Sequence, residues 1–366
     1  MAAEPHRSGQ TLPPGPSIFL QPTDPAQLAT DGLNQAYTVA LPTGPVRRLV
    51  YRSVVKGTVT CAVDGADVMG SAGVPLRVDA SATAPSADQA RRHALSKGLA
   101  RHAAGLWDAE ALSKHPPQPP HGTGPGPWAR MWVGDGDREV WMPAARVYSP
   151  FRLGNGRLVG DDEGLACAGT LDAARAGAQM SQVRRRALLP LWQALERQKR
   201  AGEPPLAPDE GVRDLVVGHA HGLSLAVSFQ WSAAGPFFGV TGLGCAADDA
   251  SALAQARSDR VHTEAQLRLQ QAGVWGGPPQ SRPPDMDVHV HRLAWNADEA
   301  SAMAVLVSRW HARARPAASG AQRSALAWAD LTPPALREMG LWVVRSLWLD
   351  GEGGWLSRPA PLSPPH

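Results

Sequence analysis

Two pairs of histidines have a spacing that could bind a metal ion. His219 and His221 form one HxH pair, and His289 and His291 form the other. If each pair lies on a β-strand, both of its imidazoles point to the same face, because side chains alternate along a strand. Two imidazoles on one face can serve as ligands of zinc or iron. Asp287 is in phase with the second pair and could add a carboxylate.

Neither pair is specific for a metal on its own. The first pair precedes Gly222, so it fits a turn as well as a strand, and the second fits a polar strand face without any metal. Cys61, Cys167 and Cys245 lie far apart and form no CxxC motif, so the sequence indicates neither a thiolate zinc site nor a disulfide framework. We therefore expect no bound metal and keep a histidine-bound metalloprotein as an alternative hypothesis.

Signals for a nucleophile or a phosphate loop are weak. Gly242 and Gly244 precede a helical segment, but no third glycine completes GxGxxG and no GKS or GKT follows. The sequence contains no GxSxG elbow. Cys167 and Cys245 lie beside glycine turns without an assigned histidine or aspartate, so we expect buried, inert thiols there.

Three segments have the apolar spacing of helices and could position side chains around one site. They cover residues 89–106, residue 171 to about 200, and about 248 to 271, with Pro190 predicting a kink or an end in the second. Predicted strands cover 46–63 (as a pair), 139–142, 215–217, 223–229, 237–244, 288–293 and 342–348, and shorter helices cover 297–311 and 334–339. This order predicts an α/β (α+β) fold in which mixed sheets pack against three long site helices.

The positions of the Pro- and Gly-rich segments predict one main domain. Residues 1–44 are rich in Pro, Gly and polar residues and are predicted to form a flexible N-terminal arm. Residues 45–357 form the predicted domain, with surface loops at 115–127 and 276–284, and Asp64-Gly65 as a turn between or just after the first two strands. Residues 358–366 form a Pro-rich C-terminal tail.

Composition argues against nucleic acid and membrane as partners. Against 36 Lys and Arg stand 33 Asp and Glu, a net charge of only +3. The basic runs at 91–92 and 184–186 lie within helical patterns without aromatic stacking neighbours. No run of about 18 apolar residues occurs, and prolines interrupt the first 20 residues, where a signal peptide would be apolar. We therefore expect a cytoplasmic protein.

Five short motifs, in their order along the chain, resemble the YcaO family. They are AxxxALSKGLARH at 90–102, WMPAARVY at 141–148, GLA with GTL at 164–171, GLGCAADDASALAQARSDRVH at 242–262 and DLTPPALREMGLWVVR at 330–345. The resemblance covers the chain from about Val46 to the C-terminus, where the Pro-rich tail resembles in part the PxPxP end of azoline-forming members. It implies the YcaO fold and the activity of that family, which activates peptide backbone amides with ATP to make azolines or thioamides.

The residues that the family uses to hold magnesium and ATP are largely replaced on the first two helices. Lys97 and Ala100 stand where the ExxER motif of the first helix has its glutamates, and only Arg101 matches. Ser181 and Arg184 stand at the corresponding positions of the second helix, where only the arginine that follows them, Arg185, matches. The resemblance therefore implies a site that has lost four acidic residues.

Acidic residues persist at a few neighbouring positions. Asp162 and Glu163 replace the Ser-Asn that precedes the glycine turn of the family. On the third helix Asp259 takes the glutamate position and His262 the glutamine position, and a shifted register would use Glu264 instead. Only this third helix keeps a candidate ligand at a matching position.

Magnesium requires hard oxygen ligands, which lysine and arginine do not provide. Lys97 and Arg184 could contact a phosphate directly as cations but could not hold the metal. We therefore predict a catalytically impaired YcaO-like protein without a cofactor. Its predicted partners are a precursor peptide of ribosomal peptide modification, a second YcaO-like or other pathway protein, and, by family analogy, a second copy of the chain.

The alternative hypothesis is a divergent ATP-dependent cyclodehydratase that binds ATP and magnesium. Its substitute metal ligands would be Asp162, Glu163, Asp259 or Glu264, and Arg101 and Arg185 would contact phosphate.

Overall fold

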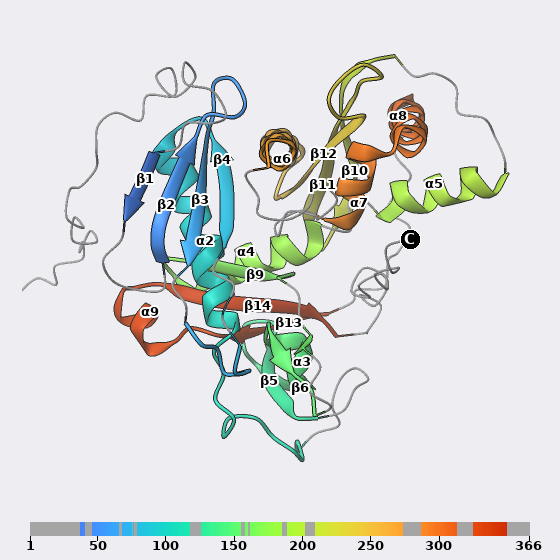
Figure 1. Ribbon diagram of the computed structural model, residues 1–366. Coiled ribbons are helices and arrows are strands. Elements are labelled where there is room, and N and C mark those ends of the chain that lie inside the picture. Colours follow the sequence, from blue (N-terminus) through green and yellow to red (C-terminus); the bar gives the residue numbers. More distant parts are fainter. Residues whose placement is uncertain are drawn as a thin grey trace, which may run out of the picture.

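The structure is a computed structural model of the 366-residue chain (Figure 1). It describes residues 37–40, 46–65, 68–74, 76, 79–117, 126–154, 158–159, 162–184, 189–201, 209–273, 287–312 and 325–349. Every strand pair in these ranges is antiparallel. Helices and antiparallel sheets together confirm the predicted mixed fold class.

The N-terminal sheet has four strands in the order β1-β2-β3-β4. The strands are β1 (Tyr37–Ala40), β2 (Val46–Arg52), β3 (Val59–Gly65) and β4 (Ala80–Ala84), and helix α2 (Ala87–Ala104) packs against them. Alanines form much of this contact, so helix and sheet approach closely. Ser86 caps α2 by accepting a hydrogen bond from the backbone N–H of Gln89 at 3.3 Å.

Two details of this sheet differ from the expectation. Asp64 and Gly65 are the last residues of β3, and the β2–β3 connection is residues 53–58. Of the two expected positions for the Asp64-Gly65 turn, between the strands or just after them, the first is therefore wrong, and residues 66–67, which follow the second, lie outside the described residues. Strand β1 lies inside the stretch that we assigned to the N-terminal arm, because its backbone pairs with β2. The rest of that arm lies outside the described residues, as does the C-terminal tail.

The second sheet has five strands in the order β6-β5-β13-β14-β9. Its elements are β5 (Trp128–Val133), β6 (Arg138–Pro143), β9 (Leu165–Ala168), β13 (Leu326–Asp330) and β14 (Trp342–Trp348), with α4 (Leu171–Arg184) packed on one face. The short elements beside it are α3 (Ala144–Val147), β7 (Phe151–Arg152), β8 (Leu158–Val159) and α9 (Pro334–Glu338). The C-terminal hairpin β13–β14 thus lies between β5 and β9. It places β9, which has Gly164 and Gly169 at its two ends, beside α4.

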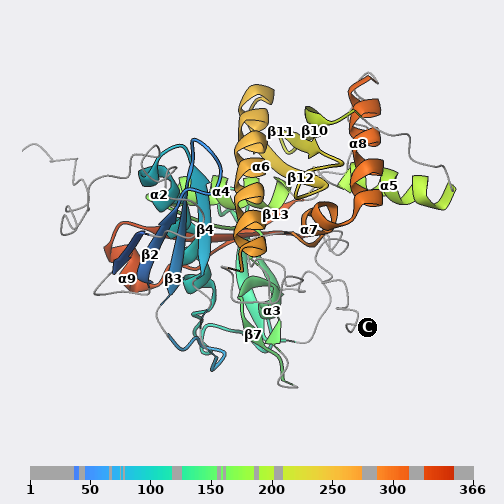
Figure 2. The same cartoon turned by 45° about the horizontal axis from the view of Figure 1, so that its top comes forward.

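The third sheet has three strands in the order β10-β11-β12. Its elements are β10 (Gly211–Ala220), β11 (Leu223–Trp231) and β12 (Gly239–Ala246), with α5 (Leu189–Ala201), α6 (Asp249–Gln271), α7 (Val288–Trp295) and α8 (Ala297–Ala312) around it. Figure 2 shows α6 upright between β4 of the first sheet and β12 of the third. This helix therefore joins two sheets and faces α2 and α4, which is where a shared site can form.

One predicted strand is a helix. Residues 288–293 were expected to be extended because they alternate apolar and polar types, but they belong to α7. Asp287 caps this helix by accepting from the N–H of His289 at 2.8 Å, and Val290, Leu293 and Ala294 point into the core at helical spacing. A segment of six residues fits both periods, so tertiary packing decides between them.

The second predicted long helix is two helices in the structure. Helix α4 ends at Arg184, and α5 begins at Leu189 with Pro190 as its second residue, a position where the missing N–H of proline costs no hydrogen bond. Pro190 therefore lies in the first turn of a helix and does not end one, and residues 185–188, between α4 and α5, lie outside the described residues. The predicted helices at 89–106, 248–271, 297–311 and 334–339 and the strand at 342–348 are confirmed.

Within the described ranges, no helix is both long and apolar enough to cross a membrane.

The contact between α6 and β12 depends on two glycines. A Cβ on Gly242 would overlap the backbone of Ala256 and Arg260, and a Cβ on Gly244 would overlap the backbone of Ala252. Backbone atoms cannot move aside as a flexible side chain can. The two glycines therefore set the distance at which α6 presents its site residues.

We predict that Gly242→Ala and Gly244→Ala each lower the free energy of unfolding by about 3 kcal/mol or more, because overpacking against backbone has no local relief. Urea unfolding followed by tryptophan fluorescence measures the change. Gly218→Ala on β10 is the matched control, since a Cβ there meets nothing within 4 Å, and should change stability by about 0.5 kcal/mol or less. Equal losses for all three variants would contradict the close approach of α6 and β12.

Candidate functional site

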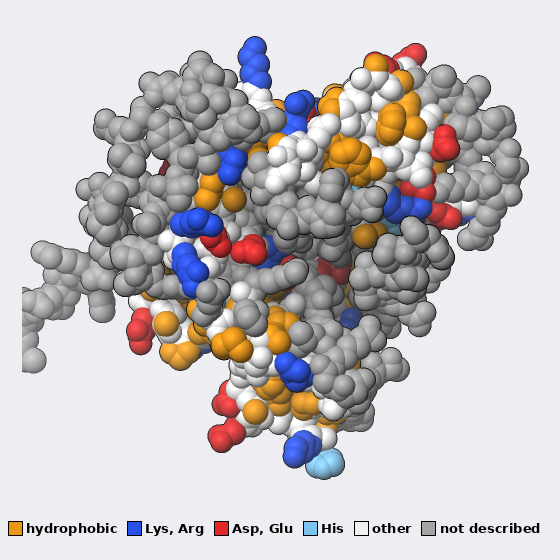
Figure 3. All heavy atoms as spheres, viewed as in Figure 1, with side chains coloured by type: hydrophobic (Ala, Val, Ile, Leu, Met, Phe, Trp, Pro, Cys, Tyr) orange, Lys and Arg blue, Asp and Glu red, His pale blue; other side chains and the backbone are white. Residues whose placement is uncertain are grey.

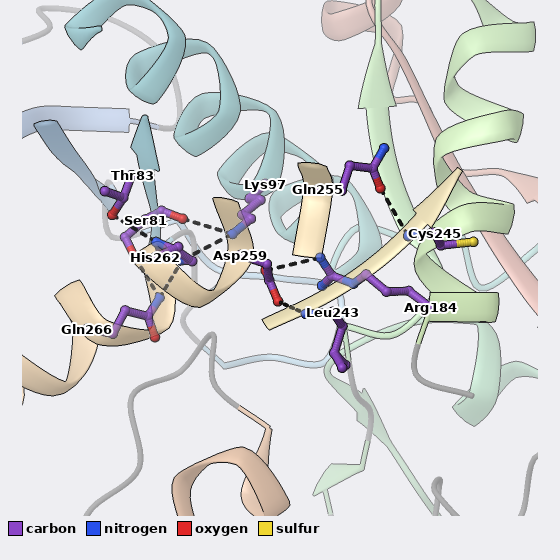
Figure 4. A network of polar contacts seen from close by, with 10 residues as sticks. All are labelled: Ser81, Thr83, Lys97, Arg184, Leu243, Cys245, Gln255, Asp259, His262 and Gln266. Carbon is purple, nitrogen blue, oxygen red and sulfur yellow. Dashed lines mark hydrogen bonds and ion pairs between the residues drawn. The ribbon is translucent and has the colours of Figure 1, made fainter. Parts of the chain in front are cut away.

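The residues that the family resemblance places at glutamate or glutamine positions come together where α2, α4 and α6 approach one another (Figure 4). Lys97 lies on α2, Arg184 is the last residue of α4, and Asp259 and His262 lie on α6. Strand β4 completes this region from the side of the first sheet. The structure therefore groups residues that are up to 185 positions apart in the sequence.

Lys97 is held by β4 and by the third helix. Its Nζ donates to the backbone oxygen of Ser81 at 3.0 Å and lies 3.4 Å from Nε2 of His262. Nε2 of His262 also lies 2.7 Å from Nε2 of Gln266, and its Nδ1 lies 3.1 Å from Oγ1 of Thr83. An ammonium and an amide nitrogen are donors only, so Nε2 of His262 accepts and Nδ1 carries the proton that it donates to Thr83. Nε2 has a single lone pair, so Gln266 is its closer donor and Lys97 its more distant one.

Arg184 and Asp259 form an ion pair between α4 and α6. Nη1 of Arg184 lies 3.2 Å from Oδ1 of Asp259, and Oδ2 of Asp259 accepts the backbone N–H of Leu243 on β12 at 2.9 Å. The side chain of Asp259 is 24% exposed and that of Arg184 is 41% exposed. Both carboxylate oxygens of the residue at the retained acidic position are thus bound by groups of the protein itself.

Two of the remaining acidic candidates pair with an arginine, and the third is buried. Asp162 accepts from Nε of Arg101 at 2.8 Å, and Arg101 donates in addition to the backbone oxygen of Asp79. Glu264 pairs with Arg268, one turn later on α6, at 2.7 Å. Glu163 is buried.

The other substituted positions on α2 and α4 contribute little to a metal site. Ala100 is buried and has no ligand atom, and Ser181 is half-buried on α4. Arg185 lies outside the described residues.

The histidine pairs do not have the predicted geometry. His219 is on β10 with Nε2 3.1 Å from Oδ1 of Asp249, whereas His221 is in the following turn with φ 54° and its ring lies 4.7 Å from that of Trp348. His289 and His291 are on α7, where two residues are separated by about 200° around the axis, so they point to different sides. In the part of the chain that the structure describes, no three His, Cys, Asp or Glu residues are grouped to hold a metal ion.

Cys245 is buried as expected, whereas Cys167 is only half-buried. Burial raises the pKa of Cys167 and of Cys245 to about 11 and that of Cys61 to about 12. Arg184 lowers the pKa of Cys245 by its charge, but burial is the larger effect. A thiol with such a pKa is protonated at neutral pH and is a poor nucleophile.

Three contributors to the site were not singled out from the sequence. Ser81 and Thr83 lie on β4, a five-residue strand of small residues that we did not predict, and Gln266 lies one turn after His262 on α6. The spacing of His262 and Gln266, which puts both on one helix face, was the only available signal. The partners on β4 depend on tertiary contacts across the sheet.

Comparisons with known proteins place the fold. No family model and no curated protein sequence matches the chain. The YcaO structure from Methanopyrus kandleri bound with AMPPCP and Mg²⁺ superposes with a TM-score of 0.54 and 17% identity, covering 93% of both chains. A chain of the E. coli microcin synthetase McbBCD complex superposes with a TM-score of 0.56 and 12% identity, covering 86% of this chain and 91% of that one. A chain of the same complex with pro-MccB17 bound superposes with a TM-score of 0.51 and 10% identity, covering 86% of this chain and 91% of that one. The chain therefore has the YcaO-like fold that its sequence motifs indicated.

We predict unequal contributions of the two charged partners to stability. Asp259→Ala should lower the free energy of unfolding by about 2 kcal/mol, because it leaves the N–H of Leu243 without an acceptor. Arg184→Ala should cost about 1 kcal/mol or less, because its guanidinium is partly solvated. Urea unfolding of both variants and of the double variant gives the coupling energy, expected at about 0.5 kcal/mol. If Arg184→Ala cost as much as Asp259→Ala, the N–H contact of Leu243 would not be the main contribution.

Proposed function

We propose that this chain is a YcaO-like protein of ribosomal peptide modification in which the nucleotide site is closed by the protein's own side chains. It acts as a peptide-binding or partner subunit and has no ATP-dependent catalysis of its own. The observation that carries this proposal is the ion pair of Arg184 with Asp259, whose second oxygen is bound by the N–H of Leu243. By the family resemblance, the positions of Arg184 and Asp259 both hold a metal-binding glutamate in the YcaO family.

The residues present do not fit magnesium. For Asp259 to bind Mg²⁺ it would have to release Arg184 and the N–H of Leu243, and the metal would then lie beside the cationic heads of Arg184 and Lys97. Like charges at such distances repel, most strongly where the site is partly buried. Ala100 supplies no oxygen to offset this cost. The substitutions on α2 and α4 therefore act together against a metal-bridged triphosphate.

A divergent ATP-dependent cyclodehydratase is the second candidate. The likeness to a YcaO structure bound with AMPPCP and Mg²⁺ favours it, since that protein binds the nucleotide on the same fold. Of the four substitute ligands of this hypothesis, Asp162, Asp259 and Glu264 each pair with an arginine, and Glu163 is buried. A nucleotide would have to displace those arginines or use them as phosphate contacts.

The relatives support a role in an assembly. The McbBCD structures are complexes of a synthetase, and one of them has pro-MccB17 bound. A YcaO-like chain without its own metal site can still contribute a peptide-binding surface or a partner contact to such a complex. Peptide and partner are thus the ligands that we propose, in place of a nucleotide.

We predict no magnesium-dependent binding of ATP with a dissociation constant below about 1 mM, a free energy of about 4 kcal/mol. Isothermal titration of the chain with ATP in the presence and absence of MgCl₂ measures it, with Asp259→Ala as the site variant. Asp64→Ala, which removes an exposed ion pair of the first sheet, is the control. Micromolar binding that requires magnesium and is lost only in Asp259→Ala would overturn the proposal in favour of the enzyme.

We predict that the chain binds a precursor peptide encoded beside its gene, with an affinity that ATP and magnesium leave unchanged. Fluorescence polarisation of the labelled peptide, with a scrambled peptide as control, measures this. A peptide bound no better than its scrambled form would refute the peptide-binding role. Co-elution with a YcaO-like protein encoded nearby would then decide whether the chain is a partner subunit.

A further inference from the structure

We infer that a pocket beside α6, between the first and third sheets, binds an apolar side chain followed by an acidic residue in a peptide. This inference rests on the proposed function in taking the ligand to be a peptide. The pocket has a volume of about 260 Å³. Its floor and walls come from the end of β4, the start of β10 and the middle of α6. It is lined by Thr58, Thr83, Ala84, Pro85, Val212, Asp214, Arg257, Ser258, Arg260 and Val261.

The apolar part of the pocket fits one medium-sized side chain. Val212 is 42% exposed, although it is a large hydrophobic residue on a strand, and Ala84, Pro85 and Val261 also line the pocket. Covering such a surface with a leucine or valine side chain removes apolar area from water on both partners. A volume of this size holds a side chain with part of its backbone and is too small for most drug-sized ligands.

The charged rim favours an acidic group. Arg257, which is 58% exposed, pairs through Nε with Oδ2 of Asp214 at 2.7 Å. Arg260 donates to two neutral groups, Oγ of Ser228 at 3.1 Å and Oε1 of Gln230. Two arginines and one aspartate leave the rim one positive charge in excess. A carboxylate next to the bound apolar side chain would supply the balancing charge and accept hydrogen bonds from the guanidinium groups.

The pocket also touches the closed site. Thr83 lines the pocket, and its Oγ1 lies 2.9 Å from Oγ1 of Thr60 and 3.1 Å from Nδ1 of His262. A ligand that rests on Thr83 therefore contacts the hydrogen-bonded group that holds Lys97. Figure 3 shows Lys or Arg side chains beside hydrophobic ones on the face of the molecule near α6.

The test uses acetyl-Leu-Glu-amide and acetyl-Leu-Gln-amide as probes of the full-length chain. Saturation-transfer NMR at millimolar concentrations should show the leucine methyl groups in contact with the protein and a binding constant for the Glu probe about 5-fold tighter than for the Gln probe, as expected for one partly solvated ion pair. Equal binding of the two probes, or no saturation transfer to either, would overturn the inference.

Two variants examine the two halves of the pocket separately. Arg260→Gln should remove the preference for Glu over Gln, and Val212→Asp should weaken both probes, the Glu probe more. Loss of the Arg260 contacts can lower the stability of Arg260→Gln, but Val212 is exposed, so we expect Val212→Asp to fold normally. Circular dichroism checks the fold of both variants. Arg138→Gln, at an exposed position on β6, should bind both probes as the unaltered chain does. If neither Arg260→Gln nor Val212→Asp changed binding, the pocket would not be the site.

The outcome is separable from that of the proposed function. Failure of the dipeptide to bind here leaves the titration with ATP and magnesium unaffected, and a chain that binds ATP can still be tested for the pocket. Only the location and the sequence preference of the bound peptide depend on this experiment.

Discussion

The ion pair between Arg184 and Asp259 is the interaction on which the rest of the site depends. It connects α4 with α6, and the N–H of Leu243 connects the same carboxylate with β12. A cation at the position of a metal ligand would by itself leave an excess of positive charge between the helices. The retained acid neutralises that charge. By the family resemblance both positions belong to metal-binding acids, and here the cation at one of them pairs with the acid that remains at the other.

The same compensation occurs on the other side of α6. By the family resemblance Lys97 stands at an acidic position and His262 at a glutamine position. Nζ of Lys97 lies 3.4 Å from Nε2 of His262, and Thr83 accepts from Nδ1 of the histidine. Lys97 is exposed, and β4 supplies a backbone carbonyl as one acceptor for its ammonium group. The cationic side chains of Lys97 and Arg184 are thus each connected to α6, one by a hydrogen bond and the other by an ion pair.

Much of the fold could be predicted from the sequence because its local signals agree. The helices α2, α6 and α8 combine apolar spacing with capping residues, and Pro and Gly mark the loops between them. The errors occurred where the local signal is short or ambiguous. Residues 288–293 fit a strand or a helix, β4 is five small residues without periodicity, and β1 pairs with β2 within a stretch rich in turn-forming residues.

The candidate site could be predicted only as a set of aligned positions. The motifs identified Lys97, Arg184, Asp259 and His262 as substituted residues, but no local pattern shows that Lys97 meets His262 or that Arg184 meets Asp259. Those contacts join residues 165 and 75 positions apart. The HxH pairs illustrate the opposite case, since their spacing indicated chemistry that depended on a strand, and three of the four histidines are not on one.

The glycines of β12 constrain how this site can move. Gly242 and Gly244 let the backbone of α6 pack directly against the strand with no side chain between them. Because the two backbones are in contact, we expect α6 and β12 to move together. A motion that separates α6 from α2 or α4 would therefore carry β12 with it, whereas the long side chains of Lys97 and Arg184 can change rotamer without moving either element.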